Sequence, residues 1–366
     1  MSANDRTDGD RLEWRAPPVV TPDWWIYRGT GRPIHDIALA ELLPPPPPWR
    51  KFRGGPLPDT DTPPEDDGDE DRRLGVECHL TERDVDTHEV NMVNAALYLR
   101  RPLLVTGRPG TRKSSLAWQI ARELRLGRVL RWPITSHTTL KNGQYGYDAI
   151  GRAQATAARL AGNTGPPATE QSVGEFIRLG PLGTALLPTK LPRVLLIDEL
   201  DKSEADLPND LLGALEDGEF VIDELERIRS RSREVEVFTS DPGRTAVIRD
   251  GRVRCREFPL IVITSNGERE FPEAFLRRCL RLEMRDPDAN MLAAMVANHV
   301  LDERGEHRDR LVAEFVERSA TSGGLPADRL LDAVYLATSG AYSESDPTWP
   351  HLINALWRRL DHDPVR

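Results

Sequence analysis

Cysteines, clustered histidines and long apolar runs are scarce in this sequence. Only three cysteines occur among 366 residues, at Cys78, Cys255 and Cys279, and their wide spacing fits no metal site, so we expect reduced thiols. The 8 histidines are scattered without the spacing of a metal site or a catalytic triad. There is no run of about 18 apolar residues, and the N-terminus is polar. We therefore expect no membrane span and no signal segment, and predict a cytoplasmic protein.

An excess of basic charge is also lacking. The formal net charge is −10 at pH 7, whereas non-specific binding to nucleic acid requires a basic face. Nucleic acid is therefore an unlikely partner, although local basic patches are compatible with this composition. The length allows one large domain or two smaller ones.

Residues 1–74 have the composition of a disordered tail. They hold the Pro44–Pro48 run and many acidic residues between Asp59 and Asp71, a combination that predicts an extended segment without a core. Trp24, Trp25 and Trp49 are exceptions, because aromatic side chains are costly to leave in water. Two interpretations are open: they pack on the protein's own folded domain, or they bind a neighbouring subunit or partner protein.

A glycine-rich turn lies between a predicted strand at 103–105 and a predicted helix at 114–124. Such a turn can bind phosphate through its backbone N–H groups and the helix N-terminus. Lys113 is placed to reach the outer phosphates, and Ser114 to hold Mg²⁺ with its hydroxyl. Arg112 departs from the pattern, which has glycine before the lysine. The predicted loop comprises Gly107, Arg108, Pro109, Gly110, Thr111, Arg112, Lys113, Ser114 and Ser115.

A second signal is the apolar run at 192–197, which ends in Asp198 and Glu199. Taken alone, it is typical of a strand end that exposes two acids to solvent. Together with the upstream loop, it predicts that Asp198 reaches the metal and that Glu199 reaches the attacking water.

The rest of the chain follows an α/β pattern up to about residue 285. The periodicity predicts helices at 86–99, capped by Asp86 or Thr87, and at 172–179, and a hairpin insertion within 220–258. A strand at 259–264 ends in Ser265 and Asn266, and the pattern after residue 287 is helical.

Together these motifs resemble an AAA+ ATPase, and within that class a MoxR-like one. Residues 107–114 resemble its Walker A motif, 195–199 its Walker B motif, and 264–266 its sensor 1 strand tip. The resemblance implies an α/β P-loop fold over residues 75–285, with a five-stranded parallel sheet covered by helices on both faces. It also implies a small helical lid over residues 286–366, and insertions near 138–180 and 221–258 that face a pore.

The same resemblance implies ATP with Mg²⁺ at the boundaries of a homo-oligomer, commonly a hexameric ring. Glu199 and Asn266 would then position water. Arg278, or its neighbour Arg277, would be the finger that reaches the adjacent subunit's nucleotide, and Arg329 the sensor 2 residue. The alternative for Arg277, Arg278 and Arg329 is a solvated surface arginine.

The leading functional hypothesis is therefore an ATP-driven remodeller of a partner protein, which family resemblance suggests carries a von Willebrand A domain. A second hypothesis is a nucleotide-gated scaffold with weak or no hydrolysis that recruits partners through its tail; Arg112 favours it, whereas Asp198, Glu199 and Asn266 favour an enzyme. A DNA-handling machine is a third, less favoured hypothesis.

Overall fold

The computed structural model describes residues 22–34, 39–57, 64–76, 85–160, 173–299, 305–322, 325, 327–338 and 347–357. Cys78, the proline- and glycine-containing stretch at 162–168 and the first 21 residues lie outside these ranges.

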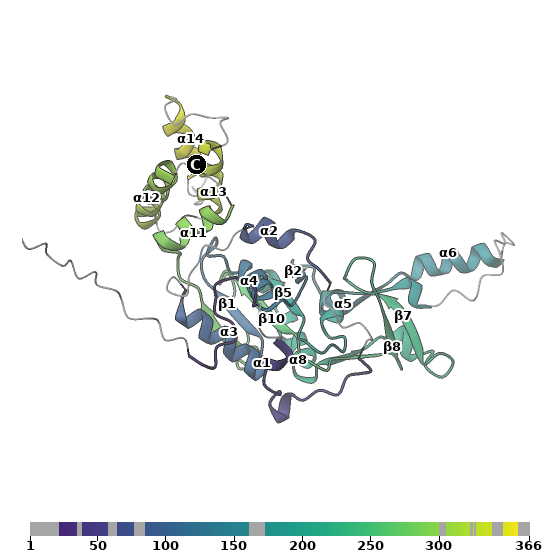
Figure 1. The fold of residues 1–366 in the computed structure, drawn as a ribbon. Helices are drawn as coiled ribbons and strands as arrows, with labels where there is room; N and C mark the ends of the chain where they lie inside the picture. Colours follow the sequence, from purple (N-terminus) through teal and green to yellow (C-terminus); the bar gives the residue numbers. More distant parts are fainter. Residues whose placement is uncertain are drawn as a thin grey trace, which may run out of the picture.

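A five-stranded parallel sheet forms the centre of the molecule, as the resemblance implied (Figure 1). Its strand order is β11-β1-β10-β5-β2, and all four neighbouring pairs are parallel. Because the sheet is covered on both sides, its inner strands are continuous apolar runs rather than alternating ones. The strands are β1 (Leu103–Thr106), β2 (Leu130–Pro133), β5 (Val194–Asp198), β10 (Leu260–Ser265) and β11 (Leu280–Glu283).

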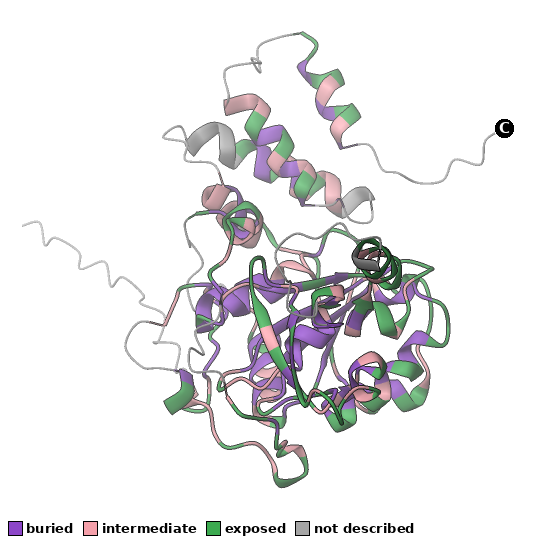
Figure 2. Cartoon of the chain, turned by 90° about the vertical axis from the view of Figure 1, so that its right-hand side faces the viewer, coloured by how far each residue is buried: buried purple, intermediate pink, exposed green. Residues whose placement is uncertain are grey.

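Alternate residues of these strands contribute to two separate hydrophobic clusters. Leu103, Val105 and Leu196 face a cluster shared with helices α3 (Thr87–Leu99) and α4 (Ser115–Leu124). Leu104 and Ile197 face a second cluster, shared with α7 (Pro181–Ala185) and α8 (Leu207–Asp217). Figure 2 shows the buried residues concentrated along the central strands. Helices therefore cover both faces of the sheet.

The two predicted insertions join into one second sheet of six strands, ordered β3-β4-β7-β8-β9-β6. Strands β7 and β8 form an antiparallel hairpin, as predicted, and in Figure 1 they lie with α6 on the side away from the C-terminal helices. The elements of this part are β3 (Tyr145–Tyr147), α6 (Ala149–Leu160), β4 (Ile177–Leu179), β6 (Glu219–Val221), β7 (Glu234–Phe238), β8 (Thr245–Arg249) and β9 (Arg252–Arg254).

The predicted helix at 172–179 is wrong. Residues Val173–Phe176 form a 3-10 turn, η2, and Ile177–Leu179 form β4, which pairs with β3 and β7. Ile177 and Leu179 are both buried, whereas the residue between them is exposed. This alternation fits a strand, and pairing with distant strands outweighs the local helical pattern.

The C-terminal helices have a hydrophobic cluster of their own, made of residues between Leu292 and Trp357. Figure 1 shows these helices beside the central sheet. Within the described residues, no helix is both long and apolar enough to span a bilayer. The helices are α11 (Ala289–His299), α12 (Gly305–Ser322), α13 (Asp328–Thr338) and α14 (Trp349–Leu356).

Part of the predicted N-terminal tail belongs to the core, which corrects the expectation that residues 1–74 build none. Ile26 and Tyr27 are buried, and their backbone N–H groups donate to Asn94 Oδ1 at 2.8 and 3.0 Å. Glu123 of α4 accepts the N–H of Gly31 at 2.8 Å. Buried polar groups of the folded domain thus supply partners for this backbone, a requirement that the local composition does not reveal.

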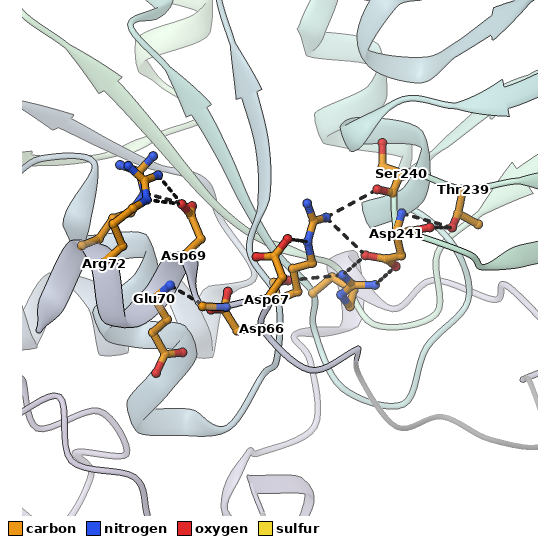
Figure 3. Close-up of polar contacts among 12 residues, drawn as sticks. Asp66, Asp67, Asp69, Glu70, Arg72, Thr239, Ser240 and Asp241 are labelled. Carbon is orange, nitrogen blue, oxygen red and sulfur yellow. Dashed lines mark hydrogen bonds and ion pairs between the residues drawn. The ribbon is translucent and has the colours of Figure 1, made fainter. Parts of the chain in front are cut away.

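The acidic stretch before residue 74 also makes contacts. Arg122 of α4 pairs with Glu70 and Asp71. Arg128 pairs with both Asp67 and Asp241, at 3.6 and 3.8 Å, so it links this stretch to the second sheet. Figure 3 shows Asp67 and Asp241. The short elements that complete the fold are α1 (Leu39–Leu42), η1 (Pro48–Arg50), α2 (Asp69–Leu74), α5 (Leu140–Gln144), η3 (Leu200–Lys202), α9 (Asp223–Glu226) and α10 (Glu273–Leu276).

Candidate nucleotide-binding site

The glycine turn after β1 closes around Lys113. The Lys113 ammonium donates to the backbone carbonyls of Gly107 and Arg108 at 2.8 and 2.7 Å, and burial lowers its pKa. Gly107 has φ of 146°, and a Cβ there would lie 2.8 Å from the Met284 carbonyl oxygen. The turn therefore requires glycine at this position, and it holds a cation where a phosphate-binding loop needs one.

The remaining loop residues are more exposed. Arg108, Pro109 and Gly110 lie at the surface, and Arg108 pairs with Asp286 at 3.1 Å. Thr111 is buried and donates its hydroxyl to the Arg108 carbonyl at 2.8 Å. Ser115 is the first residue of α4, so the loop leads directly into a helix N-terminus.

Arg112 has a left-handed backbone, with φ of 64°. This is the conformation that glycine adopts without cost, which explains why the pattern has glycine here. The guanidinium lies close enough to the Glu89 carboxyl to lower its pKa, against a larger increase caused by burial, and the resulting pKa of Glu89 is about 7. Glu89 also accepts a hydrogen bond from the Tyr27 hydroxyl at 3.2 Å.

Ser114 and Asp198, the two predicted metal ligands, lie in direct contact. The Ser114 hydroxyl donates to Asp198 Oδ1 at 2.6 Å, and the Thr264 hydroxyl donates to the same oxygen at 3.0 Å. Despite burial, the hydrogen bonds from Ser114, Arg131 and Thr264 hold the Asp198 pKa below its usual range. A hydroxyl and an ionised carboxylate are oxygen ligands of the kind that Mg²⁺ prefers, so the donor set fits that ion.

Glu199 and Asn266 also lie together, at the ends of the adjacent strands β5 and β10. The Asn266 side-chain amide donates to Glu199 Oε1 at 3.2 Å. Lys202 donates to Glu199 Oε2 at 2.7 Å, and the backbone N–H of Asn266 donates to Asp201 at 2.9 Å. Lys202 and Asp201 thus position this pair, a role that no local motif in the sequence indicates.

Arg277 and Arg278 lie at the end of α10 and pair with carboxylates of their own chain. Arg278 contacts Glu216 at 2.5 Å and also donates to the Ala274 carbonyl, whereas Arg277 contacts Glu273 at 2.5 Å. The side chain of Arg277 is 72% exposed and that of Arg278 is 34% exposed.

Arg329 lies on α13, where its side chain donates to the Leu356 carbonyl of α14 at 3.4 Å. Its contacts described here are therefore within the C-terminal helices, and the structure does not bring it together with the loop residues.

A cavity of about 310 Å³ adjoins the loop. Arg112 and Glu89 lie in its wall with Gly29 from the N-terminal segment, and Met284 and Met291, the latter from α11, also line it. Sequence reasoning did not predict this cavity, because its wall combines segments that are distant in the sequence.

Comparison with known proteins agrees with this geometry. Residues 102–279 match the family described as AAA domain (dynein-related subfamily). Residues 102–279 form an AAA domain. This confirms the AAA+ resemblance inferred from the motifs, and AAA domains as a class bind and hydrolyse ATP with Mg²⁺ and typically oligomerise.

Two solved structures are similar to this chain. A mutant of Thermotoga maritima RuvB has 15% identity and a TM-score of 0.41, with 77% of this chain and 72% of that one covered. C. elegans PCH-2 has 16% identity and a TM-score of 0.32, with 74% and 62% covered. No curated protein matches the sequence.

Proposed function

We propose that this protein is a MoxR-like AAA+ ATPase of the cytoplasm that couples ATP binding and hydrolysis to the remodelling of a partner protein. The observation that carries the proposal is the convergence of Lys113, the Ser114–Asp198 contact and the Glu199–Asn266 contact around the ends of three adjacent strands. These are the cation, the metal ligands and the water-positioning groups that phosphoryl transfer to water requires.

In this proposal each side chain has one role. Lys113 would bind phosphate oxygens in place of its two carbonyl partners. Ser114 and Asp198 would hold Mg²⁺, which would supply positive charge beside the phosphates. Asn266 and Lys202 hold the Glu199 carboxylate in place so that it accepts a proton from the attacking water. The cavity beside Arg112 takes the nucleoside part of ATP.

We further propose that the active unit is a ring of identical subunits, hexameric as in the family that the motifs resemble. Arg278, with Arg277 as the alternative, leaves its acidic partner and reaches the nucleotide of the next subunit. Charge-assisted hydrogen bonds of this kind stabilise the transition state of phosphoryl transfer. Arg329 would act as sensor 2 only after the C-terminal helices move, since it contacts α14 in this structure. The partner, by the same resemblance, is a protein with a von Willebrand A domain.

Phosphate release by the purified protein, with and without Mg²⁺, tests the proposal. We expect turnover that requires Mg²⁺ and is lost in Lys113→Ala, while a control variant on the surface of α6, Arg152→Ala, retains it. Turnover that Lys113→Ala leaves unchanged would exclude this site as its origin.

A second function, a nucleotide-gated scaffold, is favoured by the left-handed Arg112. A non-glycine residue there is strained by about 1–2 kcal/mol, and this can displace Lys113 from the position that hydrolysis needs. The same assay separates the two functions: the scaffold binds nucleotide in the presence of Mg²⁺ and releases no phosphate above background.

A further inference from the structure

The guanidinium of Arg131 donates hydrogen bonds to the carboxylate of Asp198, which is proposed to hold Mg²⁺. It extends from β2, the edge strand next to β5, and donates to Asp198 Oδ2 from Nη2 at 2.8 Å and from Nε at 3.2 Å. Neither the phosphate-loop motif nor the strand-end acids predicted a role for this residue.

The two oxygens of Asp198 have different partners. Oδ1 accepts the hydroxyls of Ser114 and Thr264, at 2.6 and 3.0 Å, and Oδ2 accepts Arg131. Both oxygens of the Asp198 carboxylate therefore accept hydrogen bonds in this structure. A metal ion held by Ser114 and Asp198 would have to share this carboxylate with a guanidinium, which is also positively charged.

The burial of the two side chains indicates which one moves. The Asp198 side chain is 8% exposed and is held by two hydroxyls, whereas the Arg131 side chain is 44% exposed on an edge strand. A half-exposed guanidinium can return to water at little cost, because ion pairs near solvent are weak. The buried carboxylate cannot lose all its partners, since an unpaired buried charge is costly.

We propose that Arg131 occupies the cation side of Asp198 in the nucleotide-free protein and is displaced when Mg²⁺ binds there with nucleotide. This inference rests on the proposed function, because it takes Mg²⁺ with ATP as the ligand. Arg131 is then a positioning residue: its two hydrogen bonds orient the Asp198 carboxylate, and its competition raises the magnesium concentration at which the site fills.

Equilibrium binding of a fluorescent ATP analogue to the full chain tests this inference without measuring turnover. Mg²⁺ is titrated at a fixed analogue concentration, and a parallel titration of the analogue is made in EDTA. For Arg131→Gln we expect half-maximal binding at roughly three- to tenfold lower Mg²⁺, and an unchanged affinity in EDTA. Arg131→Lys keeps the positive charge but loses the paired N–H donors of the guanidinium. The Mg²⁺ concentration for half-maximal binding should therefore fall between those of Arg131→Gln and the parent.

Arg152→Ala is the matched control, because it removes an arginine that contacts Tyr147 on the second sheet and not the site. Thermal unfolding of each variant confirms that it is folded, and if Arg131→Gln does not fold, Arg131→Lys still gives the comparison. An unchanged magnesium midpoint in a folded variant would overturn the inference.

A weaker affinity in EDTA would also overturn it, by making Arg131 a phosphate ligand instead. Failure of the proposed function looks different, because the parent protein itself would then not bind the analogue at any Mg²⁺ concentration, and both proposals would fall.

Discussion

The side-chain amide of Asn266 lies 3.2 Å from Glu199 Oε1, although 67 positions separate the two residues in the sequence. Strands β5 and β10 are adjacent and parallel, so their carboxyl ends meet at one edge of the sheet. Glu199 has a left-handed backbone, with φ of 62°. A strained conformation at a strand end is typical of a functional position.

The first prediction concerns this pair. Glu199→Gln keeps the shape of the side chain and removes its ability to accept a proton, so we expect nucleotide binding with Mg²⁺ to persist and phosphate release to fall at least about a hundredfold. Binding of a fluorescent analogue and phosphate release are measured on the same preparation. Equal turnover in variant and parent would remove Glu199 from the mechanism.

The second prediction is that the active site is shared between subunits. Arg278→Ala should bind nucleotide and lose hydrolysis, because the finger acts on the neighbour's nucleotide. Mixed with Lys113→Ala, it should regain part of the activity, since some boundaries then combine an intact loop with an intact Arg278. Arg277→Ala tests the alternative finger and should retain hydrolysis, and Arg152→Ala is the neutral control. Hydrolysis that persists in demonstrably monomeric Arg278→Ala would contradict the shared site.

The central sheet and its polar strand ends were predictable because their signals are local. Apolar runs mark β1, β5 and β10. Asp198 is the last residue of β5, Asn266 directly follows β10, and Lys113 lies in the glycine turn after β1. Strand β4 was not predictable, since three residues become a strand only by pairing with β3 and β7. No motif indicated Arg131, because its contact with Asp198 depends on β2 and β5 being neighbours in the sheet.

The packing of the N-terminal segment was not predictable for a related reason. The segment has too few apolar residues to fold alone, and its backbone is held by Asn94 and Glu123, which are distant in the sequence. The indole N–H of Trp25 donates to Asn91. This contact agrees with the interpretation that the aromatic residues pack on the protein's own domain. Trp49 is 75% exposed, so the second interpretation, binding to a partner, stays a prediction for this residue.

The third prediction measures this packing. Asn94 bonds the backbone N–H groups of Ile26 and Tyr27 and the Tyr27 carbonyl, all in buried surroundings. Asn94→Ala should lower the free energy of unfolding by about 2–3 kcal/mol, because buried groups lose their partners. Asn91→Ala is the control with a smaller expected loss, since its bond to Trp25 is only partly buried. Urea denaturation gives both values, and a loss of less than about 1 kcal/mol for Asn94→Ala would show that these bonds contribute little to stability.

The fourth prediction is a pH dependence caused by Glu89. Its pKa is raised by burial to about 7, with Arg112 and Tyr27 opposing and Asp86 and Glu123 adding to the increase. Between its usual pKa and about 7 the folded state binds more protons than the unfolded state, so stability falls as the pH rises through this range.

Glu89→Gln should remove this dependence. Between pH 4.5 and 7.5, the unfolding free energy of the parent should fall by about 2–3 kcal/mol relative to that of the variant. Each unit of pKa shift corresponds to about 1.36 kcal/mol. Urea denaturation at several pH values measures it, and other titrating groups cancel in the difference. Parallel curves for the two proteins would mean that the pKa of Glu89 is the same in the folded and unfolded states.

The last prediction concerns Arg112. Its φ of 64° carries a strain of about 1–2 kcal/mol that glycine would not have, so Arg112→Gly should stabilise the loop. The substitution also removes the cation near Glu89, and this loss opposes the gain. Binding of ATP should therefore change little.

Turnover is more sensitive, because a displacement of Lys113 by about 1 Å can lower the rate about a hundredfold. We expect a larger rise in phosphate release than in affinity. Arg112→Ala separates the two terms, since it removes the charge and keeps the strain. If Arg112→Gly lowers both affinity and turnover, Arg112 is a ligand of the nucleotide, and its side chain, not its backbone, explains its presence in the loop.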